Sequence, residues 1–78
     1  MQKISTLSYI DLLKNILNKQ VHFTSDCEFF PNFDIRCIVY NISLSKNNNE
    51  ILMDVKILNS NKKITIGSNM KNLQFEFI

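Results

Sequence analysis

The sequence predicts an α+β domain in which an N-terminal helix is followed by a five-strand curled antiparallel sheet. Apolar residues recur at helical spacing between residues 6 and 18, whereas the clearest alternation in the chain runs from Ile51 to Ile57, with Asp54 and Lys56 on the polar side. Clusters of asparagine, serine and glycine separate the strand-like segments at the spacing of hairpins. No repeat or linker divides the 78 residues, so we expect a single small domain, 1–78.

The predicted helix spans residues 6–18. Ser5 or Thr6 is expected to cap its N-terminus, and Asp11 near the start and Lys14 near the end agree with the helix dipole. A helix of about twelve residues is marginal alone. Its apolar stripe must therefore pack on the sheet, and that stripe consists of Tyr9, Ile10, Leu13, Ile16 and Leu17.

The remaining chain predicts strands joined by short turns. We expect these strands at residues 20–24, 35–44, 51–57, 64–66 and 73–77, with an irregular loop at 25–32. Within 35–44, residues 38, 40, 42 and 44 are expected to share one face, and residues 35, 37 and 39 the other. Gly67, the sole glycine, is expected to supply a turn with positive φ. A flat sheet of this size cannot bury its apolar face, which favours closure into a small barrel.

Composition limits the classes of function. Residues 1–35 carry three lysines against four acids, and residues 36–78 carry one arginine and five lysines against three acids. The net charge of +2 does not by itself indicate a nucleic-acid partner, because phosphate binding usually requires a clustered basic surface. No apolar run approaches the roughly 20 residues that cross a bilayer. The first residues lack the features of a secretory signal, so we expect a cytoplasmic protein with Cys27 and Cys37 as free thiols.

Residues with catalytic chemistry are sparse. His22 is the only histidine, and it is expected to be an ordinary surface residue on the polar side of the first strand. Cys37 lies in an apolar segment and is expected to act as a small core residue. One glycine cannot form a phosphate-cradling loop, and one histidine with two cysteines does not complete a metal site. The sequence therefore predicts neither an enzyme nor a cofactor or metal site.

Two segments resemble Sm-like RNA-binding proteins. Residues 12–21 resemble the end of that family's helix and its first strand, and residues 66–73 are similar to its second motif, an Arg-Gly turn followed by asparagine and an apolar residue. The chain has Ile66 in place of the arginine and Asp54 in place of a base-facing asparagine. The resemblance implies a small Sm-like barrel, although a Src-homology-3-like barrel has much the same layout. It also implies an RNA-binding oligomeric ring, with binding residues Lys56, Lys62, Lys63, Lys71 and Asn69.

Two hypotheses of function follow. The first is a non-enzymatic protein-interaction module, such as an accessory or inhibitor protein of a phage or mobile element. It would bind another protein through Phe29, Phe30 and Phe33 and through exposed strand edges, although the same rings could instead plug one end of the barrel. The alternative is the RNA-binding ring. The acid at Asp54 and the missing arginine at Ile66 favour the first hypothesis.

Overall fold

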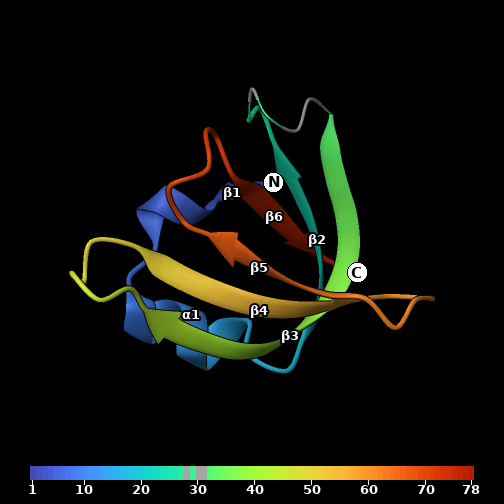
Figure 1. Ribbon diagram of the computed structural model, residues 1–78, viewed down its shortest axis with the longest axis horizontal. Helices are drawn as coiled ribbons and strands as arrows, with labels where there is room; N and C mark the ends of the chain where they lie inside the picture. Colours follow the sequence, from blue (N-terminus) through green and yellow to red (C-terminus); the bar gives the residue numbers. More distant parts are fainter. Residues whose placement is uncertain (28, 30–31) are drawn as a thin grey trace.

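The computed structural model describes residues 1–27, 29 and 32–78 and consists of one antiparallel sheet, one short α-helix and one turn of 3₁₀ helix (Figure 1). The six strands lie in the order β1-β6-β2-β3-β4-β5. In chain order the elements are β1 Gln2–Lys3, the 3₁₀ turn Ile4–Thr6, α1 Tyr9–Asn15, β2 Gln20–Ser25, β3 Phe33–Leu44, β4 Ile51–Ile57, β5 Lys63–Gly67 and β6 Gln74–Phe77.

The predicted combination of a helix with an antiparallel sheet is confirmed, but the strand count is not. Gln2 and Lys3 form a sixth strand, β1, which pairs with β6. This strand precedes the helix and has only two residues, too few to show any alternation. The curled sheet is compatible with a small barrel.

The helix is shorter than predicted at both ends, because its N-cap is Ser8, not Ser5 or Thr6, and it ends at Asn15, before residue 18. The Ser8 hydroxyl accepts a hydrogen bond from the Asp11 backbone N–H (3.2 Å). The Asp11 carboxylate accepts one in return from the Ser8 N–H (3.1 Å), which completes a capping box. Residues 4–6 form the preceding 3₁₀ turn instead.

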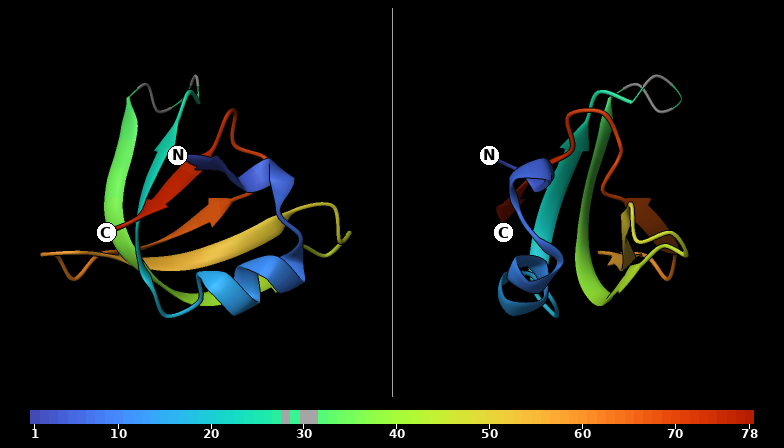
Figure 2. Two further views of the ribbon diagram at one scale, coloured as in Figure 1. Left: turned by 180° about the vertical axis from the view of Figure 1, so that it is seen from behind. Right: turned by 90° about the vertical axis from the view of Figure 1, so that its left-hand side faces the viewer.

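The helix packs against β3 at one end of the sheet (Figure 2), and most of the predicted stripe faces the core, because Tyr9, Leu13 and Leu17 are partly buried against it. Leu12, which lies outside that stripe, and Ile16, which lies within it, are fully buried. Ile10 was expected to be covered and is 60% exposed. With only two turns, α1 directs fewer residues toward the sheet than a helix over 6–18 would.

β3 is the longest strand and curves through the molecule, so that it pairs with β2 along its first part and with β4 along its second (Figures 1 and 2). The β3–β4 register shifts between Val39 and Asn41, which marks a β-bulge at Tyr40. Val39 and Ile42 are both buried, while Tyr40 is exposed. The prediction that residue 42 faces away from residue 39 is therefore wrong, because the extra residue of the bulge restores Ile42 to the core face.

The sheet curls around the core (Figure 2), to which β2, β3, β4, β5 and β6 all contribute buried side chains. Phe23 is fully buried and packs at 6.5 Å, between ring centroids, from Phe75. The buried apolar residues are Ile4, Leu12, Ile16, Val21, Phe23, Cys37, Val39, Ile42, Met53, Val55, Ile66, Leu73 and Phe75.

Asparagines, not the glycine, supply the left-handed backbone of the described turns. Positive φ angles occur at Asn18, Asn32, Asn48, Asn59 and Asn72, and none occurs at the single glycine. This corrects the predicted role of that glycine, and asparagine tolerates positive φ better than other residues with a Cβ. A Cβ at this glycine would meet only the carboxylate end of the Glu50 side chain, which is flexible, so the space around the glycine does not require it either.

Candidate interaction surfaces

The edge of the sheet at β5 is open. The backbone bonds at the two ends of the β4–β5 ladder run from Ile57 N–H to the Lys62 carbonyl (3.0 Å) and from Ser68 N–H to the Ile51 carbonyl (2.8 Å). Along an edge strand of an antiparallel sheet, successive backbone N–H groups point alternately toward and away from the neighbouring strand. The N–H groups of Lys63, Thr65 and Gly67 are those that point away from β4. Within residues 1–27, 29 and 32–78, none of these three N–H groups has a hydrogen-bond partner.

The opposite edge of the sheet is covered by the N-terminal segment. β1 pairs with β6 through Gln2 opposite Phe75 and Lys3 opposite Gln74. The next N–H along the chain, that of Ile4, donates to the Leu73 carbonyl (2.9 Å). The two ends of the sheet therefore differ: β1 pairs with Gln74 and Phe75 of β6, whereas no described segment pairs with β5 on the side away from β4.

The two faces of β5 differ in chemistry. Ile66 is buried and Ile64 packs partly buried against the core, whereas Lys63 and Thr65 are exposed on the outer face. The Thr65 hydroxyl donates to the Asp54 carboxylate (2.7 Å) on β4.

Asp54 itself lies in a row of polar residues that crosses three strands. The Asn41 side-chain amide donates to its carboxylate (2.9 Å) from β3, and the Thr65 hydroxyl does so from β5. These two hydrogen bonds, first that of Asn41 and then that of Thr65, lower the pKa of Asp54 below its ordinary value. The carboxylate is therefore ionised and already has hydrogen-bonding partners.

Basic side chains gather where β4 and β5 are joined. Lys56 and Lys63 lie opposite each other in the β4–β5 register, and Lys62 directly precedes β5. The Lys63 ammonium lies 5.4 Å from the ring centroid of Tyr40, within cation–π range. Among the described residues, every ion pair involves His22, so no carboxylate neutralises these lysines.

A shallow hollow of about 440 Å³ borders this group of lysines. Its apolar lining comes from β3 and from the end of β4, and amide and hydroxyl side chains of the β4–β5 turn supply its polar rim. The lining residues are Ile38, Lys56, Ile57, Leu58, Asn59, Ser60 and Asn61.

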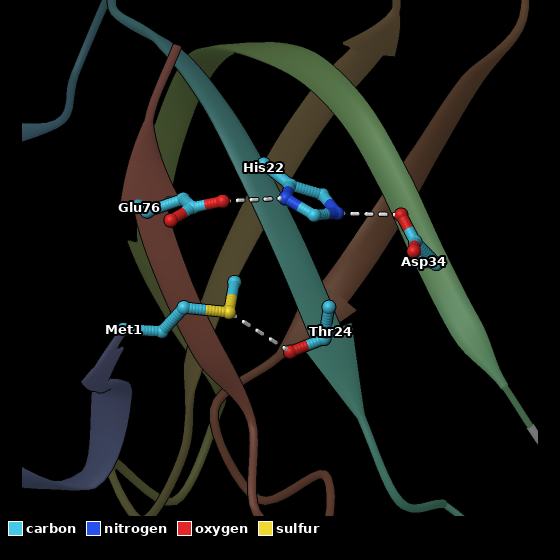
Figure 3. A network of polar contacts seen from close by, with 5 residues as sticks. All are labelled: Met1, His22, Thr24, Asp34 and Glu76. Atoms are coloured by element: carbon cyan, nitrogen blue, oxygen red, sulfur yellow. Dashed lines mark hydrogen bonds and ion pairs between the residues drawn. The ribbon is translucent and has the colours of Figure 1, made fainter.

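His22 is held between two carboxylates on the outer face of the sheet (Figure 3). From the middle strand β2, its Nε2 contacts Asp34 of β3 (2.5 Å) and its Nδ1 contacts Glu76 of β6 (3.0 Å). The hydrogen bonds to Glu76 and then to Asp34 raise the pKa of His22 above its ordinary value. The prediction from the sequence that His22 lies on the polar face of its strand is correct. The prediction that it is an ordinary surface histidine did not include its contacts with the Asp34 and Glu76 carboxylates.

The structure separates the residues that the Sm-like resemblance brings together. Lys56, Lys62 and Lys63 lie at one end of β5, while Asn69 and Lys71 follow Gly67 at the other, about 13 Å away along the strand. The Asn69 N–H donates to the Glu50 carboxylate (3.3 Å), and the Lys71 carbonyl accepts from Asp26 N–H (3.0 Å) and the Ser25 hydroxyl (2.8 Å).

The predicted aromatic surface is also divided. Phe29 is 87% exposed, whereas Phe33, the first residue of β3, is partly buried against the core. Phe30 lies outside the described residues. The exposure of Phe29 suits contact with a partner protein. The partly buried position of Phe33 suits the other interpretation, in which the ring closes one end of the barrel.

Both cysteines are free thiols. Cys37 is buried in the core, and burial raises its pKa to about 12, so it stays protonated. The described residues contain no cluster of three or more histidine, cysteine or acidic side chains placed to hold a metal ion. They also contain no helix with the length and apolar character needed to cross a membrane.

No protein-family model, curated protein or solved structure matches the chain.

Proposed function

We propose that this chain is a protein-interaction module that binds an extended segment of a partner protein as an additional strand along β5. The observation that carries the proposal is the row of outward N–H groups at Lys63, Thr65 and Gly67. A peptide in extended conformation offers carbonyl and N–H groups at the spacing needed to continue such a ladder. The hypothesis from the sequence named both the aromatic loop and exposed strand edges, and this proposal keeps the strand edge as the binding surface.

The difference between the two sheet edges supports this proposal. Exposed strand edges favour unwanted pairing with other chains, so proteins usually shorten, charge or cover them. Here β1 covers part of the edge of β6, while no segment of the described chain pairs with β5 on the side away from β4, where the Lys63 and Thr65 side chains are exposed. A lysine on an open edge discourages pairing between copies of the chain, yet it leaves the backbone accessible to a segment of suitable charge.

An Sm-like RNA-binding ring is the alternative proposal, and two observations weigh against it. A head-to-tail ring that continues the sheet from one copy to the next needs a strand edge of useful length at each end, and the edge opposite β5 is the two-residue strand β1. The lysines assigned to RNA binding are also divided between the two ends of β5. The assignment of the curled sheet to an Sm-like or Src-homology-3-like barrel likewise stays a proposal.

The test compares two substitutions at one position. Thr65→Pro removes the outward N–H, and proline is tolerated on an edge strand where that group faces solvent. Thr65→Val is the matched control, because it removes the hydroxyl bonded to Asp54 and keeps the N–H. Tagged wild-type, Thr65→Val and Thr65→Pro chains are used to capture proteins from the native lysate, and each captured protein is then produced alone for affinity measurements.

We expect a partner that binds the wild-type and Thr65→Val chains alike and binds Thr65→Pro about tenfold or more weakly, since a lost donor leaves a partner carbonyl unpaired. Circular dichroism checks that both variants are folded. Phe29→Ser examines the aromatic loop in the same assay. The proposal is contradicted if no captured protein distinguishes Thr65→Pro from Thr65→Val, or if binding depends on Phe29 alone.

A further inference from the structure

From the same edge, and resting on the proposed function, we infer that the partner segment alternates acidic and apolar residues. A strand paired with β5 directs its side chains in turn to the two faces of the sheet. On the inner face these side chains meet the partly buried Ile64 and the end of the core. On the outer face they meet Lys63 and Thr65.

The outer face near the start of β5 is positively charged. Lys63 and Lys56, opposite it on β4, are exposed on this face, and exposed Lys62 lies at the end of the turn that leads into β5. The ionised Asp54 carboxylate lies on the same face, but it accepts hydrogen bonds from Asn41 and Thr65 and forms no ion pair with these lysines. Three cations without an ion-pair partner in the described chain therefore border the open edge, and carboxylates on a paired strand would lie beside them.

The inner side favours an apolar residue for a separate reason. Ile64 is packed against the core and yet only partly buried, because no strand lies beyond it. An apolar side chain on the added strand would remove more of this surface from water, at roughly 25 cal/mol for each Å² buried. Alternation follows because adjacent residues of the added strand must meet these opposite requirements.

The same geometry distinguishes a peptide from a single-stranded nucleic acid. Phosphates could also neutralise the lysines, but a nucleic-acid backbone has no alternating N–H and carbonyl groups to pair with Lys63, Thr65 and Gly67. The open ladder is therefore used only by a polypeptide. The test therefore includes an oligonucleotide as a competing ligand.

The test uses capped synthetic peptides of about seven residues, a typical strand length. The first alternates glutamate and valine. Three controls replace glutamate by serine, replace glutamate by lysine, or keep the composition of the first peptide but group its glutamates and valines in blocks. Oligouridine of matched charge is the nucleic-acid probe. Affinity is measured by calorimetry at about 50 and about 500 mM salt, because screening weakens exposed charge pairs.

We expect the alternating acidic peptide to bind about tenfold or more tightly than the serine, lysine and block peptides at low salt, with the advantage reduced at high salt. The Lys62→Gln, Lys63→Gln double variant should lose most of that advantage. Lys46→Gln, in the turn before β4, is the matched control and should bind as the wild type does. Thr65→Pro should weaken binding of the acidic peptide, and Thr65→Val should not.

The outcomes separate this inference from the proposed function. If binding is sensitive to Thr65→Pro but equal for the acidic, serine and lysine peptides, strand addition stands and the acidic specificity is wrong. If acidic binding does not distinguish Thr65→Pro from Thr65→Val, or if no peptide binds, both are wrong. Binding of oligouridine but not of the peptides would assign the lysines to a nucleic acid. Sedimentation of the chain alone shows whether a second copy occupies β5, which would also overturn the inference.

Discussion

His22 is the residue whose environment departs most from what the sequence indicated. A neutral imidazole has one N–H, so it can donate to only one of two carboxylates. Both ring nitrogens of His22 contact carboxylate oxygens, at 2.5 Å for Asp34 and 3.0 Å for Glu76. The doubly protonated, positively charged ring satisfies both contacts, which tie β2 to the strands on either side.

This arrangement predicts a pH-dependent stability. The folded-state pKa of His22 is raised above its ordinary value of 6.5, chiefly by Glu76 and then by Asp34. The stabilisation is therefore complete below about pH 6.5 and is lost as the pH rises through the folded-state pKa. Relative to His22→Gln, the wild-type chain should have its greatest advantage in free energy of unfolding near about pH 6 and a smaller one near about pH 9.

Urea unfolding of both chains across this pH range provides the measurement. Comparison with His22→Gln cancels titrations that the two chains share. An advantage that stays constant or grows with pH would show that the ring is not held in its charged form. The sequence could not reveal the pair of contacts, because the carboxylates lie 12 and 54 residues away from the histidine along the chain.

At the level of single elements, the start of α1 shows how local signals compete. Several hydroxyl residues precede the helical pattern, and the sequence favoured Ser5 or Thr6 as the cap. Ser8 prevails because Asp11, three residues later, completes the reciprocal capping box. The box also lowers the pKa of Asp11, through hydrogen bonds from Ser8. The Ser-x-x-Asp spacing of Ser8 and Asp11 is visible in the sequence and would have indicated Ser8 as the N-cap.

Ser8→Ala should lower the free energy of unfolding by about 1 kcal/mol, since it leaves a helix N–H without its acceptor. Ser5→Ala is the control. Ser5 is exposed and lies in the 3₁₀ turn, so its substitution should change little. Chemical denaturation of the three chains tests this directly, and an equal loss for both variants would contradict the observed cap.

The strands show which features alternation can predict. β4 follows its predicted bounds and inward residues, because its pairing with β5 is unbroken and the bulge in the β3–β4 pairing lies in β3. β3 departs at Tyr40, since a bulge depends on how the strand pairs with its neighbour and leaves no sign in hydrophobic alternation. The sequence predicts a turn at the asparagines 47–49 because asparagine tolerates positive φ, and Asn48 adopts such a φ.

On the scale of the whole molecule, the important property is the asymmetry of the sheet edges. The sequence predicted hairpins and a curled sheet, but an edge is defined by what lies beside it in space. The two residues of β1 carry no periodic signal, and only the fold places them next to β6. The open edge of β5 could not be assigned before that placement was known.

Removing residues 1–3 should uncover β6 and leave both ends of the sheet open. One copy can then pair its β5 edge with the β6 edge of the next, so the weight-average mass in sedimentation should rise with concentration. The intact chain should stay monomeric. The control replaces Gln2 and Lys3 by alanine, which keeps the backbone pairing. An unchanged monomeric mass after the deletion would mean that β1 does not protect this edge.

Amide hydrogen exchange by NMR is the most direct test of strand addition at β5. In the free chain, the outward amides of Lys63, Thr65 and Gly67 should exchange rapidly, while those of Ile64 and Ile66, bonded to β4, should be protected. With the alternating acidic peptide bound, strand addition predicts that the three outward amides become protected. Binding that leaves these three amides as fast as in the free chain would contradict it.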